Sequence, residues 1–103
     1  MSYQGFPKQS PWGEVQDAEK IAEGVYRIHT AGHGGLMVHK TVRLSDDAYR
    51  IAGEEHGQFW CFEEDCAVAV AMHELKLGNQ VSVRATIERW YPEYLAYIKS
   101  KES

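Results

Sequence analysis

Several segments in the first half of the chain alternate apolar and polar residues with a period of two, which is typical of β-strands with one covered face. Two such segments span residues 14–21 and 25–30, and residues 36–39, which follow a glycine-rich loop, are expected to form a third strand. The connection at 22–24 is short, and the loop at 31–35 contains three glycines, so neighbouring segments are expected to pair as hairpins. The sequence therefore predicts an antiparallel meander of three strands.

The middle of the chain changes to features that favour helices. Ser45 is followed by two aspartates, and this combination is typical of a helix N-terminus because serine accepts backbone amide hydrogens and carboxylates stabilise the positive end of the helix dipole. The first helix is expected to run to about Glu55 and to end at Gly57. Residues 58–62 then form a short aromatic crossing.

A second helix is expected to begin at the acidic residues 63–65 and to continue through Leu75. Its residues 66–72 are apolar on nearly all sides, which predicts a helix covered by other elements. The pair Gly78-Asn79 predicts its end.

The last part of the chain carries apolar residues at steps of three and four, which predicts an amphipathic helix. Pro92 interrupts it, because proline lacks an amide hydrogen and disfavours helical geometry at the preceding residue, so two consecutive helices are expected. The polar tail from Lys99 is expected to fray. The apolar stripe consists of Val83, Ile87, Trp90, Tyr91, Tyr94 and Ile98.

These elements predict an α+β fold, a three-stranded antiparallel β-meander packed against two or three helices. Residues 1–12 show neither the two-residue period of a strand nor the period of about 3.6 residues of a helix. They are interpreted as an N-terminal arm, anchored at its end by Trp12. Residues 13–103 form the single domain that this length allows.

Composition and charge narrow the function classes. The chain has 103 residues, 44% hydrophobic and 25% charged, and a formal net charge of −4. This charge argues against binding of duplex DNA, which requires lysine and arginine to replace condensed counterions. The longest apolar run, 67–72, is far shorter than a membrane span. We expect a cytoplasmic protein, with Cys61 and Cys66 as reduced thiols.

Two neighbouring motifs are candidates for chemistry. His33 lies between glycines, where an exposed imidazole can act as an acid or a base, although a hairpin loop requires glycines in any case. Cys66 follows Glu63, Glu64 and Asp65, and its thiol could be activated by an imidazole close in space. The competing interpretation is that the three acids stabilise a helix N-terminus and that Cys66 packs as a small apolar residue.

Metal and cofactor binding are not expected. The five histidines are scattered, and His29 and His33 lie on a strand and a loop, where a spacing of four does not bring the rings together. The one conceivable cation site combines His33 with the acids at 63–65.

Other residues are candidates for a binding surface. Tryptophan and tyrosine are favoured at protein interfaces, and an acidic surface attracts a basic partner. The candidates on these grounds are Glu54, Glu55, Trp90, Tyr94 and Tyr97.

Together, several short motifs resemble a small domain family of unknown function whose members are products of bacteriophages, plasmids and other bacterial mobile elements. The resemblance covers residues 11–94, and it departs from the family at Ala67-Val68, where a second aromatic and acidic element is common. The family has no established activity. The motifs are Pro11-Trp12-Gly13, residues 22–26, residues 30–35, residues 62–66 and the closing segment 89–93.

The resemblance implies a context, because small acidic proteins of mobile elements frequently bind and disable a host protein, including restriction and CRISPR machinery. The first hypothesis is therefore a non-catalytic accessory protein that binds a protein partner in the bacterial host, such as a nucleic-acid-handling complex. The alternative is a small hydrolase-like enzyme with His33, Cys66, Glu63, Glu64 and Asp65 in its site.

Overall fold

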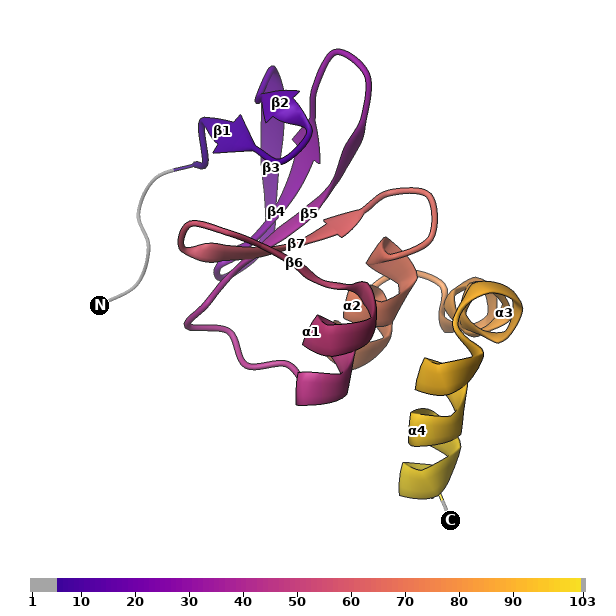
Figure 1. Ribbon diagram of the computed structural model, residues 1–103. Helices are drawn as coiled ribbons and strands as arrows, with labels where there is room; N and C mark the ends of the chain where they lie inside the picture. The colour runs from indigo at the N-terminus through magenta and orange to yellow at the C-terminus, as the bar shows by residue number, and fades with distance from the viewer. Residues whose placement is uncertain (1–5, 103) are drawn as a thin grey trace.

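The computed structural model describes residues 6–102 and shows an α+β protein with one main sheet and a layer of helices (Figure 1). The main sheet is antiparallel, with the strand order β3-β4-β5-β7-β6, and β1 pairs with β2 in a separate ribbon. The strands are β1 (Gln9–Ser10), β2 (Gly13–Glu14), β3 (Asp17–Ala22), β4 (Val25–His29), β5 (Gly34–His39), β6 (Glu54–His56) and β7 (Phe59–Glu63).

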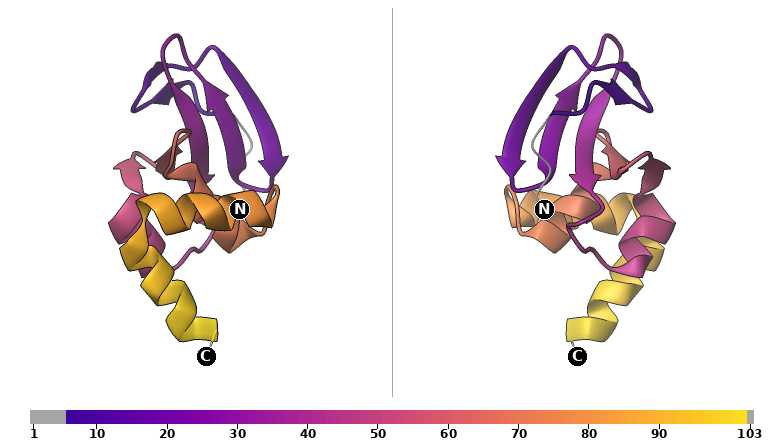
Figure 2. Two further views of the ribbon diagram at one scale, coloured as in Figure 1. Left: turned by 90° about the vertical axis from the view of Figure 1, so that its right-hand side faces the viewer. Right: turned by 90° about the vertical axis from the view of Figure 1, so that its left-hand side faces the viewer.

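The described residues contain four helices, more than the two or three expected. Figure 2 shows the last helix extending away from the sheet, so that the C-terminus lies at the opposite end of the molecule from the β1–β2 ribbon. The helices are α1 (Asp46–Ala52), α2 (Val68–Leu75), α3 (Gln80–Trp90) and α4 (Pro92–Glu102).

The predicted α+β class and the meander β3-β4-β5 are confirmed, but the meander is part of a five-stranded sheet. The prediction that residues 58–62 form a mere crossing was wrong, because β7 pairs with β5 along its whole length. Phe59, Cys61 and Phe62 are buried on both faces of the sheet, so this strand lacks the alternation that marks a half-covered strand.

The expected boundaries of the first two helices also need correction. α1 ends at Ala52, because the amide of Gly53 closes the last turn onto the carbonyls of Ala48 and Tyr49, and the next residues form the edge strand β6 instead. α2 begins at Val68, and Glu63 is still part of β7, where it pairs with Gly35.

Local signals set the other helix ends. The Ser45 hydroxyl accepts the amide hydrogen of Ala48, and the Asn79 side chain caps α3 in the same way. α4 begins at Pro92 as predicted. The tail from Lys99 is helical rather than frayed, because Glu102 forms an ion pair with Arg84 of α3 at 2.9 Å.

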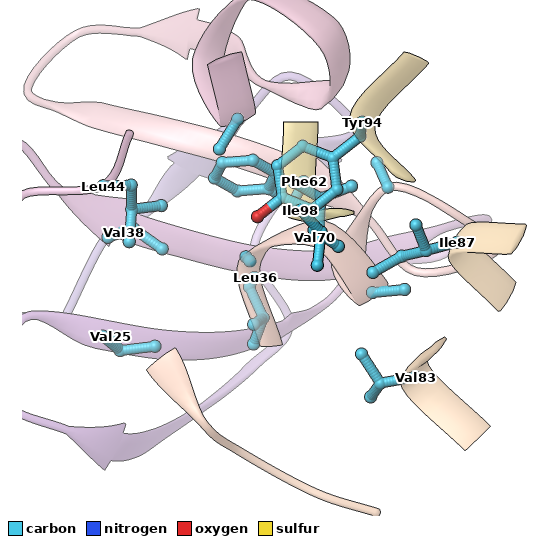
Figure 3. Close-up of a cluster of buried hydrophobic side chains, with 14 residues drawn as sticks. Val25, Leu36, Val38, Leu44, Phe62, Val70, Val83, Ile87, Tyr94 and Ile98 are labelled. Carbon is cyan, nitrogen blue, oxygen red and sulfur yellow. The ribbon is translucent and has the colours of Figure 1, made fainter. Parts of the chain in front are cut away.

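Apolar residues are buried on both faces of the sheet. The larger cluster lies between the sheet and the helices, where Leu36 and Phe62 meet Val70, Ile87 and Tyr94 (Figure 3). The smaller cluster lies on the opposite face and is covered by the N-terminal segment. It consists of Tyr26, Ile28, Met37, Phe59 and Cys61, with Trp12, Val15 and Ala18 packed against it.

The N-terminal segment is therefore integrated into the fold from β1 onward. The expected arm, 1–12, contains β1, and its final residue Trp12 packs on the smaller cluster. Residues 1–5 of that expected arm lie outside the described residues.

Candidate functional site

The glycine-rich motif at 33–35 packs closely against Trp12. A Cβ atom on Gly35 would lie 2.8 Å from Cη2 of Trp12 and would collide with the carbonyl oxygen of Phe62. A Cβ atom on Gly34 would lie 2.7 Å from the Glu64 carboxylate. The absence of side chains at these two positions thus lets the indole and Glu64 approach the strand, which gives both glycines a packing role.

His33 is at the tip of the hairpin between β4 and β5. The Thr30 hydroxyl donates to the His33 carbonyl at 2.7 Å and accepts from the His33 amide at 3.1 Å, which closes the turn. The imidazole Nδ1 lies 4.0 Å from a carboxylate oxygen of Glu63, and both side chains are about half exposed to solvent. The structure therefore brings His33 and Glu63 together, in a loose and solvated pair.

The two thiols lie in different surroundings. Cys66 is half-buried in the turn before α2 and lies beside Tyr91, whose pKa is raised by burial and further by Cys66 and Glu63. Within residues 6–102, no hydrogen bond or ion pair joins Cys66 to His33. Cys61 is buried in the sheet, and this burial raises the pKa of its thiol to about 12.

The three candidate acids at 63–65 project to different places. Glu63 faces His33, and the Glu64 backbone donates to the Gly34 carbonyl while its side chain lies over that glycine. Asp65 lines a groove of about 220 Å³ between α2 and α3, whose other walls include Val68, Met72, Ser82, Val83 and Thr86.

The candidate binding residues also separate. Glu54 and Glu55 are exposed on the edge strand β6, and Glu55 pairs with Lys40. Trp90 is 54% exposed at the end of α3, with the Arg89 guanidinium 5.1 Å from its ring. Tyr94 is fully buried, so the expectation that it forms part of a surface needs correction.

Tyr97 is half-buried against Tyr94, with their ring centroids 5.6 Å apart. The Lys101 ammonium lies 5.6 Å from the Tyr97 ring. Tyr97 therefore connects the core of α4 to its exposed side rather than forming an open aromatic face.

Glu74 is the hub of a polar network that sequence reasoning missed. Its carboxylate accepts hydrogen bonds from the Ser45 amide at 2.7 Å, the Ser45 hydroxyl at 2.5 Å and the Tyr94 hydroxyl at 2.6 Å. Burial, and then the contact with Glu74, raise the pKa of Tyr94. The network ties α1 and α4 to α2, which is a structural role. In the sequence, this network is indicated by a single acidic residue, Glu74, shortly after the apolar run 66–72.

Sequence reasoning also missed a cavity of about 230 Å³ between β4, β5 and α2. Three polar side chains line it, Arg27, His29 and Glu64, together with apolar ones from Leu36, Val68 and Met72. Arg27 and His29 were visible only as the polar positions of a strand, because the cavity forms when α2 packs across that strand.

Metal-binding groups and membrane-spanning helices are two further features to consider within residues 6–102. No group of three or more histidine, cysteine, aspartate or glutamate side chains there is arranged to hold a metal ion. No helix in that part of the chain is long and apolar enough to cross a membrane.

Comparison with known proteins identifies a family but no activity. The chain matches no curated protein and no solved structure. A family model for a domain of unknown function, DUF7007, matches residues 6–103. This match covers nearly the whole chain and agrees with the resemblance to an uncharacterised family that the motifs indicate. The chain belongs to the DUF7007 family of domains of unknown function.

Proposed function

We propose that this domain is a non-catalytic module that binds a protein partner through the C-terminal part of α3 and the groove beside it. The observation that carries the proposal is the exposure of Trp90, a large aromatic side chain that is 54% accessible at the end of α3. Tryptophan is strongly enriched among the residues that dominate binding energy at protein interfaces.

Helix geometry places Trp90 at the end of the groove. Val83, Thr86 and Trp90 are spaced by three and four residues, so they share one face of α3. Val83 and Thr86 line the groove between α2 and α3. Trp90 therefore continues the same wall beyond the groove and can act as an anchor for a segment lying along it.

The charge of the opposite wall favours a basic partner. Glu64 and Asp65 line the groove from the turn before α2, and the whole chain has a net charge of −4. Complementary charge increases association rates and is screened by salt over about 10 Å at 0.1 M. A basic nucleic-acid-handling protein of a bacterial host, such as a component of a restriction or CRISPR system, fits this chemistry and the mobile-element context of the resemblance.

The second candidate, a small hydrolase-like enzyme, has one observation in its favour. His33 Nδ1 lies 4.0 Å from Glu63, which is an imidazole oriented by a carboxylate. A Cys-His hydrolase further requires the thiol within hydrogen-bond reach of the imidazole, about 3 Å. Cys66 makes no such contact among the described residues, so the binding function is supported better.

A pull-down from bacterial lysate with matched variants tests the proposal. The variants are Trp90→Ala, Val81→Ala and the double change His33→Ala with Cys66→Ala. Val81 is a suitable control because it is 81% exposed on the same helix but about two and a half turns earlier, on the opposite side from Trp90.

We expect one protein to be retained at stoichiometric amounts by the wild type, by Val81→Ala and by the double variant, and to be lost with Trp90→Ala. Retention should weaken as salt rises, and further when Glu54 and Glu55 are both changed to lysine. A protein trapped by the double variant alone would instead indicate turnover at His33 and Cys66 and would contradict the proposal.

A further inference from the structure

The cavity between the sheet and α2 carries opposite charges that do not neutralise each other. Arg27 and Glu64 both line this space of about 230 Å³, yet no ion pair within 4.0 Å joins them. Neither side chain forms an ion pair with any other residue in the described range 6–102. A guanidinium and a carboxylate are thus both available to a molecule inside the cavity.

Apart from the third polar side chain, His29, the remaining wall is apolar. Leu36 is 1% exposed and forms part of the main core, and Val68 and Met72 are partly buried on the side of α2 that faces the sheet. Ile28 and Gly35 add strand residues to the lining. A few charged groups around an apolar surface is the usual arrangement of small-molecule sites.

The size of the cavity limits the ligand. A volume of 230 Å³ is smaller than the range of about 300–1,000 Å³ that is common for drug-sized ligands. It corresponds to about eight water volumes. A compact molecule fits, whereas a nucleotide does not.

We propose that this cavity binds a small amphoteric molecule, a free α-amino acid with an aliphatic side chain. The Arg27 guanidinium donates hydrogen bonds to its carboxylate, since arginine matches the planar geometry of that group. The Glu64 carboxylate accepts from its ammonium group. The aliphatic side chain of the ligand lies against Leu36, Val68 and Met72, and the removal of its apolar surface from water favours binding. The cavity shares Glu64, Val68 and Met72 with the groove of the proposed partner surface, but Trp90, the proposed anchor, does not line it.

Titration of the ¹⁵N-labelled protein with L-leucine, followed by NMR, tests this assignment. We expect saturable shifts in residues of β4, β5 and the N-terminal half of α2. N-acetyl-L-leucine lacks the ammonium charge and L-leucinamide lacks the carboxylate, so each should bind at least about tenfold more weakly. These two probes leave the protein unchanged, so their effect cannot arise from a folding defect.

Variants then assign the charges to residues. Arg27→Gln should weaken leucine binding about tenfold or more, while the binding of leucinamide stays as it is. Glu64→Gln should also weaken leucine binding about tenfold or more, while the binding of N-acetyl-leucine stays as it is. Arg43→Gln, at an exposed arginine outside the cavity, is the matched control and should bind leucine as the wild type does. Trp90→Ala should also bind leucine normally, because Trp90 does not line the cavity, and this result would separate leucine binding from the proposed tryptophan anchor.

Two results would overturn the assignment. One is the absence of saturable shifts with leucine at concentrations far above the millimolar range. The other is equal binding of leucine, N-acetyl-leucine and leucinamide, because this would show that neither charge takes part.

Discussion

At the scale of single residues, a few side chains hold the sheet and the helices in place. Trp12 lies against Gly35, and the Glu74 carboxylate joins Ser45 and Tyr94. A sequence motif that resembles a reactive site, such as His33 with its neighbouring glycines, can therefore contain residues whose role is close packing. This is why the glycines beside His33 do not by themselves indicate catalysis.

The packing role of Gly35 predicts a large difference between two glycine substitutions. Gly35→Ala should lower the free energy of unfolding by about 3 kcal/mol or more, because its Cβ atom would collide with Trp12 and with the backbone at Phe62. Gly32→Ala, in the same loop, should change it by less than about 0.5 kcal/mol, since no atom lies within 4 Å of the new Cβ. Urea denaturation measures both values, and similar losses in the two variants would contradict this account.

The contact between Tyr94 and Glu74 makes a second prediction. Tyr94→Phe should lower the free energy of unfolding by about 2 kcal/mol, because it removes a hydrogen bond to a charged group. Tyr97→Phe is the control, since its ring packs similarly but its hydroxyl makes no hydrogen bond within residues 6–102. If both changes have the same effect on thermal unfolding, the hydroxyl of Tyr94 does not stabilise the fold.

At the scale of elements, the sequence predicted what is decided locally. The cap at Ser45, the interruption at Pro92 and the hairpins of the meander depend on neighbouring residues, and the structure confirms them. The pairing of β7 with β5 was missed because both faces of β7 are covered, so its pattern carries no alternation. Distant residues make that pairing favourable.

The candidate site shows the same division. The proximity of His33 to the acids was anticipated in part, and Glu63 is the acid that faces it. The polar network around Glu74 and the cavity at Arg27 were not anticipated, because each joins elements far apart in the chain. Periodicity within one element contains no information about which element will cover it.

The N-terminal cap of α1 makes a prediction at this scale. Ser45→Ala should lower the free energy of unfolding by about 2 kcal/mol, because the change removes the cap at Ala48 and one hydrogen bond to Glu74. Ser82→Ala, at an exposed position of α3, should have an effect below about 0.5 kcal/mol. Chemical denaturation compares them, and an unchanged stability in Ser45→Ala would show that the cap is dispensable.

At the scale of the whole molecule, a thiol and two tyrosine hydroxyls that stay protonated in the folded state make the free energy of unfolding depend on pH in the alkaline range. Burial raises the pKa of the Cys61 thiol from 9.0 to about 12, and it also raises the pKa values of Tyr91 and Tyr94 above 10.0. In the unfolded chain these groups lose their protons at the lower values. Unfolding above about pH 9 therefore releases protons, and the stabilisation present below that pH is lost as pH rises towards 12.

We expect the free energy of unfolding to fall steadily between pH 8 and about 10.5. Cys61→Ala should make this slope shallower than it is in the wild type. The slope rather than the absolute stability is compared, since Cys61→Ala also leaves a small cavity. A wild-type stability that stays constant or rises over this range would contradict the assignment of a buried, protonated thiol.

The central claim concerns the molecule as a binding module, and it depends on Trp90. The most direct test is the dissociation constant of the purified partner, measured by isothermal titration calorimetry for the wild type, Trp90→Ala and Val81→Ala. We predict at least about a tenfold increase for Trp90→Ala and less than about a twofold change for Val81→Ala. Equal affinities for all three proteins would show that the exposed tryptophan is not the anchor and would contradict the proposed function.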